Sequence, residues 1–122
     1  NDLKGAAAVL GAIAADSKVP QEQRDLALIR QTMTEYDTIK PEVVVARLSG
    51  LAVKGSPWYG SAGELVAGAY LRQGKRTEAG KLYGEIAKDT SVPRTVRARV
   101  VQMASVLGVD AVVVEGEDKK AQ

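Results

Sequence analysis

The sequence contains two closely similar ten-residue segments, GAIAADSKVP at residues 11–20 and GEIAKDTSVP at residues 84–93, which we call the duplicated phrase. A shift of 73 residues aligns the two copies without a gap. A repeat of this kind indicates a structural unit copied along the chain, because its residues are mainly packing and turn residues. The identical pairs are Ala6 and Ala79, Gly11 and Gly84, Ile13 and Ile86, Ala14 and Ala87, Asp16 and Asp89, Val19 and Val92, Pro20 and Pro93, and Arg24 and Arg97.

Prolines mark the starts of four predicted helices. Proline is tolerated in the first turn of a helix and breaks it further in. Each proline precedes apolar residues spaced three and four positions apart, which is the spacing of one helix face. The four prolines are Pro20, Pro41, Pro57 and Pro93. Ser56 is expected to cap the third of these helices. Two further periodic stretches, at 3–16 and 75–89, bring the expected number to six helices.

Composition narrows the possible functions. The chain has 122 residues, a formal charge of +2, and neither Cys nor His. That excludes thiol nucleophiles, the usual zinc sites and His-dependent catalysis, so we expect no cofactor and no metal. Basic and acidic residues are well mixed, so we expect no nucleic-acid partner. No stretch has the roughly 20 apolar residues of a membrane span, although a chain that begins at Asn1 is expected to be a fragment or a processed form.

The repeat length predicts the architecture. A shift of 73 residues is slightly more than two units of about 34 residues, the length of a tetratricopeptide repeat. Val44, Leu48 and Leu51 supply a degenerate middle copy of the spacing seen at Ala6, Leu10 and Ile13. The fold class is therefore predicted as all-α, an array of about six antiparallel helices in three pairs with right-handed superhelical stacking. We expect the array to span 1–109, followed by a flexible tail over 110–122.

One segment matches the small–aromatic–Gly–Ala–aromatic–small pattern of that repeat. Small residues let paired helices approach, glycine permits the tight turn, and the tyrosines fill the space between neighbouring helices. Ile86 departs from the pattern because a smaller residue is usual at its position. The matching residues are Ala67, Tyr70, Gly74, Ala79, Tyr83 and Ile86.

The chain from Gly5 to Val109 resembles the tetratricopeptide-repeat-like domain of the bacterial ancillary Sec-translocon subunit and cell-division-coordinator family. The resemblance rests on three stretches, namely RDLALIRQ, the Pro-Trp helix start at Pro57 and Trp58, and AYLRQGKRTEAGKLYGEI. It implies a non-enzymatic scaffold for protein or peptide partners, in the periplasm, anchored in the inner membrane by an N-terminal helix that is absent from this chain. The translocon and periplasmic chaperones are the partners implied.

Two other classes of function stay open. A soluble adaptor or assembly module with no membrane role fits the same repeat pattern. An enzyme that uses carboxylates, such as Glu35 with Asp37 or Glu78 with Glu85, ranks third because those pairs lie at helix ends or on exposed faces.

The phase of the repeat predicts a helix face without its usual neighbour. If the helix at 3–16 corresponds to the one at 75–89, the helix that should precede it is absent. Leu10, Ile13 and Ala14 would then lack a neighbouring helix, although repeat arrays need covered ends. We expect this face to be covered by an upstream helix or by self-association.

Candidate partner-binding residues follow from the family pattern. Tetratricopeptide arrays bind extended peptides along the first helix of each unit, although many such domains use another face. In the helix that follows Pro57, Glu64 and Arg72 would clamp polar groups of the peptide while Gly68 admits its backbone. Trp58 is expected to pack inside and Tyr59 to be exposed. The predicted partner-binding residues are Tyr59, Ser61, Glu64, Gly68, Leu71 and Arg72.

The duplicated charges have two interpretations. Arg24 and Arg97 each lie eight residues after a repeated aspartate, Asp16 and Asp89. These pairs would either bind an anion or connect the end of one helix to the next. We favour the structural connection, because a copied unit would copy it.

Overall fold

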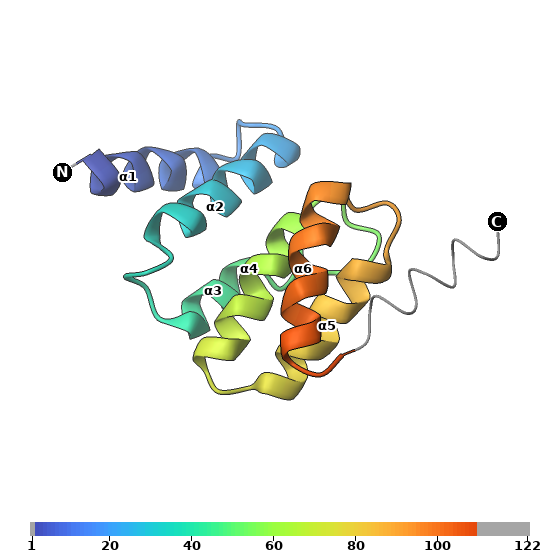
Figure 1. Ribbon diagram of the computed structural model, residues 1–122. Helices are drawn as coiled ribbons and strands as arrows, with labels where there is room; N and C mark the ends of the chain where they lie inside the picture. The colour runs from blue at the N-terminus through green and yellow to red at the C-terminus, as the bar shows by residue number, and fades with distance from the viewer. Residues whose placement is uncertain (1, 110–122) are drawn as a thin grey trace.

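The computed structural model describes residues 2–109, which form six α-helices and no strand (Figure 1). This confirms the predicted all-α array. Five helices have 13 to 15 residues, whereas α3 has 8. The expected tail at 110–122 lies outside the described residues. The helices are α1 Asp2–Ala15, α2 Gln21–Glu35, α3 Pro41–Leu48, α4 Tyr59–Arg72, α5 Arg76–Lys88 and α6 Arg94–Val106.

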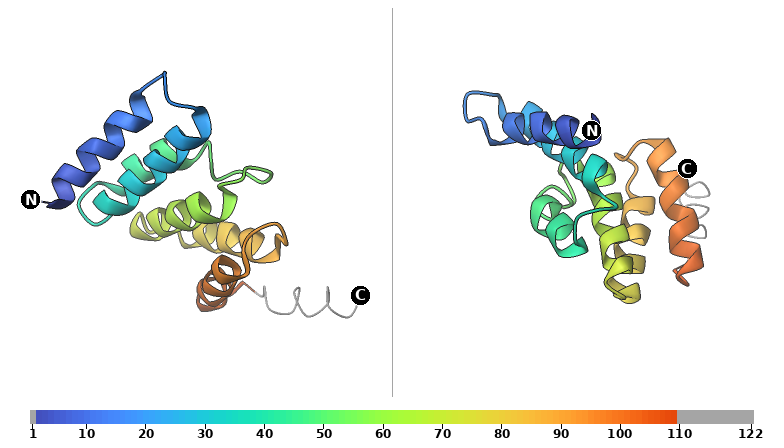
Figure 2. Two further views of the ribbon diagram at one scale, coloured as in Figure 1. Left: turned by 90° about the horizontal axis from the view of Figure 1, so that it is seen from above. Right: turned by 90° about the vertical axis from the view of Figure 1, so that its left-hand side faces the viewer.

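Each helix packs mainly on its neighbours in the chain. From α1 to α6, every consecutive pair is in contact, and α4 also contacts α2 and α6. The helices therefore follow one another across the molecule in chain order, as the view from above shows (Figure 2). Such a helical array is typical of repeat proteins, in which each unit contacts only its neighbours. The right-handed superhelical stacking stays a prediction.

The prolines mark helix starts as predicted. Pro20 and Pro93 are the N-caps of α2 and α6, and Pro41 is in the first turn of α3. The N-cap of α4 is Trp58 and not Ser56, so that prediction is wrong. The Ser56 hydroxyl instead accepts a hydrogen bond from the Trp58 backbone N–H, at 3.0 Å, and closes the turn ahead of the helix.

Gly74 ends α4 as the repeat pattern requires. Its φ of +78° is a left-handed conformation that glycine adopts without a Cβ penalty. The turn lets Lys75 donate its backbone N–H to the Tyr70 carbonyl, at 2.8 Å. The chain then reverses into α5, which lies against α4.

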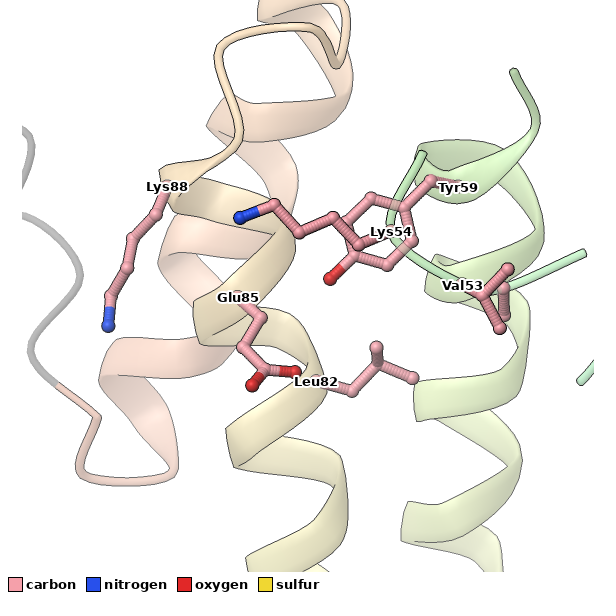
Figure 3. A pocket seen from close by; sticks show the side chains of 7 residues that line it. Val53, Lys54, Tyr59, Leu82, Glu85 and Lys88 are labelled. Carbon is pink, nitrogen blue, oxygen red and sulfur yellow. The ribbon is translucent and has the colours of Figure 1, made fainter. Parts of the chain in front are cut away.

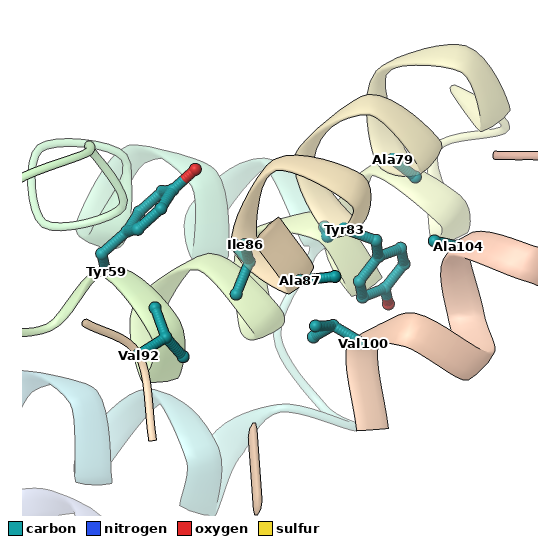
Figure 4. Close-up of a cluster of buried hydrophobic side chains, with 9 residues drawn as sticks. Tyr59, Ala79, Tyr83, Ile86, Ala87, Val92, Val100 and Ala104 are labelled. Atoms are coloured by element: carbon teal, nitrogen blue, oxygen red, sulfur yellow. The ribbon is translucent and has the colours of Figure 1, made fainter. Parts of the chain in front are cut away.

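Two apolar clusters meet around α4. The first joins α4, α5 and α6, where Tyr83 and Ala87 reach from α5 toward Val100 and Ala104 of α6 (Figure 4). The second joins α2, α3 and α4. Tyr70 and Leu82 pack against both clusters, so α4 and its neighbours share one continuous apolar interior. The second cluster is built on Ile29, Val44, Leu48, Ala62, Val66 and Ala69.

The duplicated phrase forms the same joint in both places. Asp16 accepts a hydrogen bond from the Lys18 backbone N–H at 2.9 Å, and Asp89 accepts one from Ser91 at 2.9 Å. In each copy the residue before the proline also bonds to the carbonyl of the aspartate. Short polar side chains that bond to the backbone two residues on stabilise such turns. The repeated aspartate therefore shapes the connection between two helices.

The repeated arginines also lie at these joints. Arg97 donates from Nε to the Val92 carbonyl at 3.1 Å. Hydrogen bonds from Ser91 lower the pKa of Asp89, and the charges of Lys54 and Arg97 lower it further. In the first copy, the Arg24 Nε is buried with no hydrogen-bond partner among the described residues. At the second copy, the contacts agree with a structural connection.

The middle unit differs from the outer two. Its helix, α3, ends at Leu48, so Leu51 lies in the turns that follow and not on the expected helix face. Val44 and Leu48 are nevertheless fully buried, and Leu51 packs against the same cluster. An ion pair of 2.6 Å between Arg47 and Glu35 joins α3 to the end of α2.

Repeat-equivalent residues of α1 and α5 differ in burial. Ala79 and Ile86 are 0% exposed, because α5 lies between α4 and α6. Ala6 is exposed and Ile13 is 36% exposed, because among the described residues α1 packs against α2 alone. Of the three residues predicted to lack a neighbouring helix, Ile13 is exposed, whereas Leu10 and Ala14 are half-buried, so the predicted uncovered face is present only in part.

Candidate functional site

Most of the predicted partner-binding residues lie on the face of α4 that is turned toward the end of α2 and toward α6, which we call the inner face. Ser61 and Arg72 are exposed there, and Glu64 is half-buried. Leu71 is half-buried and packs against the first apolar cluster. The structure thus places these side chains along one helix, but it also supplies several of them with partners from other helices.

Glu64 is paired with α6. The Arg99 guanidinium donates from Nε and from an Nη to the two carboxylate oxygens of Glu64, both at 2.9 Å. A two-point contact of this kind fixes the direction of both side chains. Hydrogen bonding to Glu64 also raises the pKa of Arg99. Glu64 therefore holds α6 beside α4, and Arg99 is a site residue that sequence reasoning missed.

Arg72 is paired with the loop between α2 and α3. It donates to the backbone carbonyls of Tyr36, at 2.8 Å, and Ile39, at 3.0 Å. Its guanidinium also lies 5.3 Å from the centre of the Tyr36 ring. These contacts close the last turn of α2 against α4. A role for Glu64 and Arg72 as a peptide clamp stays a prediction, since a peptide would compete with their internal partners.

Gly68 makes room for a tyrosine of this chain. A Cβ at Gly68 would clash with the Tyr36 hydroxyl, which donates a hydrogen bond to the Leu65 carbonyl at 3.0 Å. The Tyr83 hydroxyl lies 3.7 Å from the same Cβ position. The space that glycine leaves on α4 is therefore filled by Tyr36, which follows α2, and by Tyr83 of α5, and not by the partner's backbone that the sequence predicted.

Burial perturbs both tyrosines at this position. Burial raises the pKa of Tyr83 to about 12, with further contributions from Tyr36 and Glu64. Burial also raises the pKa of Tyr36, while the Arg72 charge opposes that shift. The ionised phenolate is disfavoured in the folded protein, so the free energy of unfolding is expected to fall as the pH rises into the alkaline range.

The Tyr83→Phe variant is expected to lose less stability than the unmodified protein between pH 10 and 12. The neutral Tyr83 is fully favoured below its unfolded pKa of 10.0, and that contribution is lost as pH rises toward the folded pKa of about 12. Urea unfolding at several pH values measures the difference. Parallel declines for the two proteins would contradict the assignment, because the proteins differ only at Tyr83.

Tyr59 was expected to be exposed, and that prediction is wrong. Tyr59 is 5% exposed, because its ring packs in the first apolar cluster. Trp58, which was expected to pack, does so against the second cluster. The wrong prediction arose because α4 is covered on both sides at its first turn, which the sequence pattern of one helix does not reveal.

The Tyr59 hydroxyl opens into a hollow on the other side of α4 (Figure 3). This hollow of about 380 Å³ is lined by Tyr59, by the loop before α4 and by α5. No hydrogen bond joins the hydroxyl to another described residue. Burial raises the pKa of Tyr59, and the charges of Glu85 and Asp89 raise it further. The Tyr59 ring is therefore buried, whereas its hydroxyl has free hydrogen-bonding capacity and points into the hollow.

A second hollow continues the first. It has a volume of about 240 Å³ and shares Ala52, Leu82 and Glu85 with the first hollow. Val66 and Tyr70 of α4 form part of its lining. Although α3 and α5 both pack on α4, they do not contact each other. The two hollows therefore form one groove between α5 and the segment 49–54 that follows α3, with α4 beneath it; we call it the α3–α5 groove.

The rim of the α3–α5 groove alternates in charge. On α5, Glu78, Lys81, Glu85 and Lys88 follow one another along the groove at steps of three and four. On the opposite side, Val53 is 50% exposed. An apolar floor inside a mixed polar rim is the usual composition of a protein-binding patch. The spacing of the α5 charges in the sequence could have predicted this rim. Nothing in the sequence indicated the gap beside it.

Comparisons with protein-family models, with curated proteins and with solved structures return no match to this chain. Within residues 2–109, no helix is long and apolar enough to cross a membrane. The same part of the chain holds no group of three or more acidic, His or Cys residues placed to bind a metal ion.

Proposed function

We propose that this chain is a protein–protein interaction scaffold that binds a segment of a partner protein in the α3–α5 groove. The observation that carries the proposal is the groove itself, in which the Tyr59 hydroxyl has free hydrogen-bonding capacity beside Leu82 and Val53. An extended or helical segment with apolar residues toward the floor and mixed charges toward the rim fits it. The Tyr59 hydroxyl would bond to the backbone of that segment.

The cellular setting is proposed from the family resemblance. The chain would act on the periplasmic side of a bacterial inner membrane, as the soluble part of an anchored ancillary translocon subunit. Its partners there would be the translocon, periplasmic chaperones or client chains.

Photo-crosslinking in cells tests the proposal. A photoreactive residue is placed at Val53 in the groove, or at Met33 on α2, which is 57% exposed. We expect protein adducts at position 53 that the double variant Glu85→Lys/Lys88→Glu reduces several-fold, because it inverts the rim charges beside the groove. Mass spectrometry identifies the captured proteins, so recovery of translocon subunits or chaperones also tests the cellular setting.

A matched charge inversion is the control for this experiment. Glu22→Lys/Arg30→Glu inverts two exposed charges on α2, away from the groove, with the same net charge. It is expected to leave the adducts at position 53 unchanged. If both double variants reduce the adducts equally, or if position 33 captures the same proteins as position 53, the groove is not the binding site.

A further inference from the structure

A hollow of about 500 Å³ lies on α5 at the point where the described chain ends. Leu107 and Val109, which follow α6, form one wall of it. The other wall is α5 itself, from Arg76 at one end of the hollow to Lys88 at the other. The last described residue, Val109, therefore lies in the wall of an open hollow, and the rest of the chain continues from there.

Leu107 and Val109 lie in order along α5. A Cβ at Gly80 would come within 3.4 Å of the Leu107 Cβ and within 3.1 Å of the Val109 Cγ2. A Cβ at Gly84, one turn further along α5, would come within 2.7 Å of the Val109 Cγ1. The two glycines thus leave room for the side chains of this segment. The chain therefore runs along α5 in the direction from Gly80 to Gly84.

The turn at Gly108 sets this direction. Gly108 has a φ of +86°, and the Val109 backbone N–H donates to the Ala104 carbonyl at 2.8 Å, which closes the end of α6. The helices α5 and α6 lie in contact and run in opposite directions (Figure 1). A chain that reverses at the end of α6 consequently runs parallel to α5, toward the end of α5.

The sequence after Val109 is suited to this hollow. Residues 111–114 are AVVV, an uninterrupted apolar run, with Asp110 before it and Glu115 after it. The rim of the hollow carries three basic residues and one acidic residue of α5, all exposed, namely Arg76, Lys81, Lys88 and Glu85. An apolar run between two carboxylates therefore complements apolar walls inside a mainly basic rim.

We propose that residues 110–114 continue along α5 and cover this hollow, so that the chain closes the last helix pair of its own array. An extended segment advances about 3.3 Å per residue, whereas a helix advances about 1.5 Å. Two residues beyond Val109 therefore bring Ala111 level with Lys88, one turn after Gly84. Asp110 then lies beside the basic rim. The tail expected from the sequence would begin at Glu115.

Coverage by the same chain has a physical advantage. Repeat arrays need covered ends, and here the covering segment is joined directly to the helix pair that it covers. It therefore binds without the loss of translational freedom that a separate partner would incur. The proposal does not depend on the occupant of the α3–α5 groove, whose floor is formed by α4, so it stands apart from the proposed function.

Disulfide trapping tests the path of the segment, because the chain has no cysteine of its own. The variant Ala111→Cys/Lys88→Cys places the second thiol at the end of the hollow toward which the chain runs. Ala111→Cys/Thr77→Cys is the matched control, because Thr77 is exposed and lines the opposite end of the same hollow. Positions 77 and 88 are each about 8 Å from the middle of the Gly80–Gly84 turn that Val109 contacts.

Under mild oxidation, we expect the disulfide between positions 88 and 111 to form at least about tenfold faster than the one between positions 77 and 111. Mass spectrometry of non-reduced peptides identifies the bond, and circular dichroism checks that both variants keep their helices. Similar rates for the two variants would mean that the segment has no fixed path, and a faster bond at position 77 would mean the opposite direction. Either result would overturn the proposal.

Nuclear Overhauser contacts in the unmodified 122-residue chain give the second measurement. We expect contacts from the Ala111 methyl group to the side chain of Lys88 and none to the methyl group of Thr77. The segment does not cover the hollow if the methyl groups of residues 111–114 show no contact with α5.

Discussion

Ile86→Ala is expected to lower the free energy of unfolding by about 3 kcal/mol, whereas Ile13→Ala costs less than about 1 kcal/mol. The two isoleucines occupy equivalent positions of the duplicated phrase, so the chemical change and the local sequence are matched. Ile86 is 0% exposed and fills the space beside Gly63, so its removal leaves a cavity. Ile13 is 36% exposed, so water replaces the lost atoms.

Urea unfolding of both variants measures this difference, at a dilution where self-association does not contribute. A third variant, Ile86→Val, removes one methylene group and is expected to cost about 1 kcal/mol, which checks that the loss scales with volume. Equal losses at positions 13 and 86 would contradict the packing of α5 between α4 and α6.

Gly68→Ala is expected to destabilise the protein by about 1 to 2 kcal/mol, even though alanine favours a helix by about 1 kcal/mol over glycine. The added Cβ clashes with the Tyr36 hydroxyl and displaces it from the Leu65 carbonyl. Loss of that hydrogen bond and movement of the end of α2 then outweigh the gain in helix propensity.

Tyr36→Phe isolates the cause, because it removes only the hydroxyl. The ring atom that remains, Cζ, is 3.6 Å from the Cβ position, which is ordinary contact. In the Tyr36→Phe background, Gly68→Ala is therefore expected to be neutral or stabilising. The double-mutant cycle should give a coupling of about 2 kcal/mol. A coupling near zero would mean that the Tyr36 hydroxyl is not the reason why position 68 requires glycine.

The inner face of α4 shows how far one helix pattern predicts a site. The family pattern placed Ser61, Glu64, Gly68 and Arg72 along one helix, and the structure has them on α4. Arg99 is 35 residues beyond Glu64 in the chain, and Tyr36 is 36 residues before Arg72. No local pattern reports contacts between such distant residues. The partners of Glu64 and Arg72 therefore required the packing of α2, α4 and α6.

Tyr59 and the α3–α5 groove show the same limit. A tyrosine in the first turn of a helix is exposed or buried according to what covers that turn, and here α5 and its neighbours cover it. The groove exists because α3 ends after 8 residues and does not contact α5. The regular spacing of the charges on its rim was visible in the sequence, but the gap between α5 and the segment after α3 was not.

The sequence by itself determined the six helices, their proline-marked starts and the glycine turn after α4, because these depend on residues near one another in the chain. It also determined the duplicated joint, in which Asp16 and Asp89 make the same backbone hydrogen bond. The phase of the repeat also predicted that Ile13 lacks a neighbour that Ile86 has, whereas tertiary structure alone decided that Tyr59 is buried and that Glu64 pairs with Arg99. The physical reason is that burial and pairing between helices depend on which helices lie alongside, and within residues 2–109 α4 contacts α2, α3, α5 and α6.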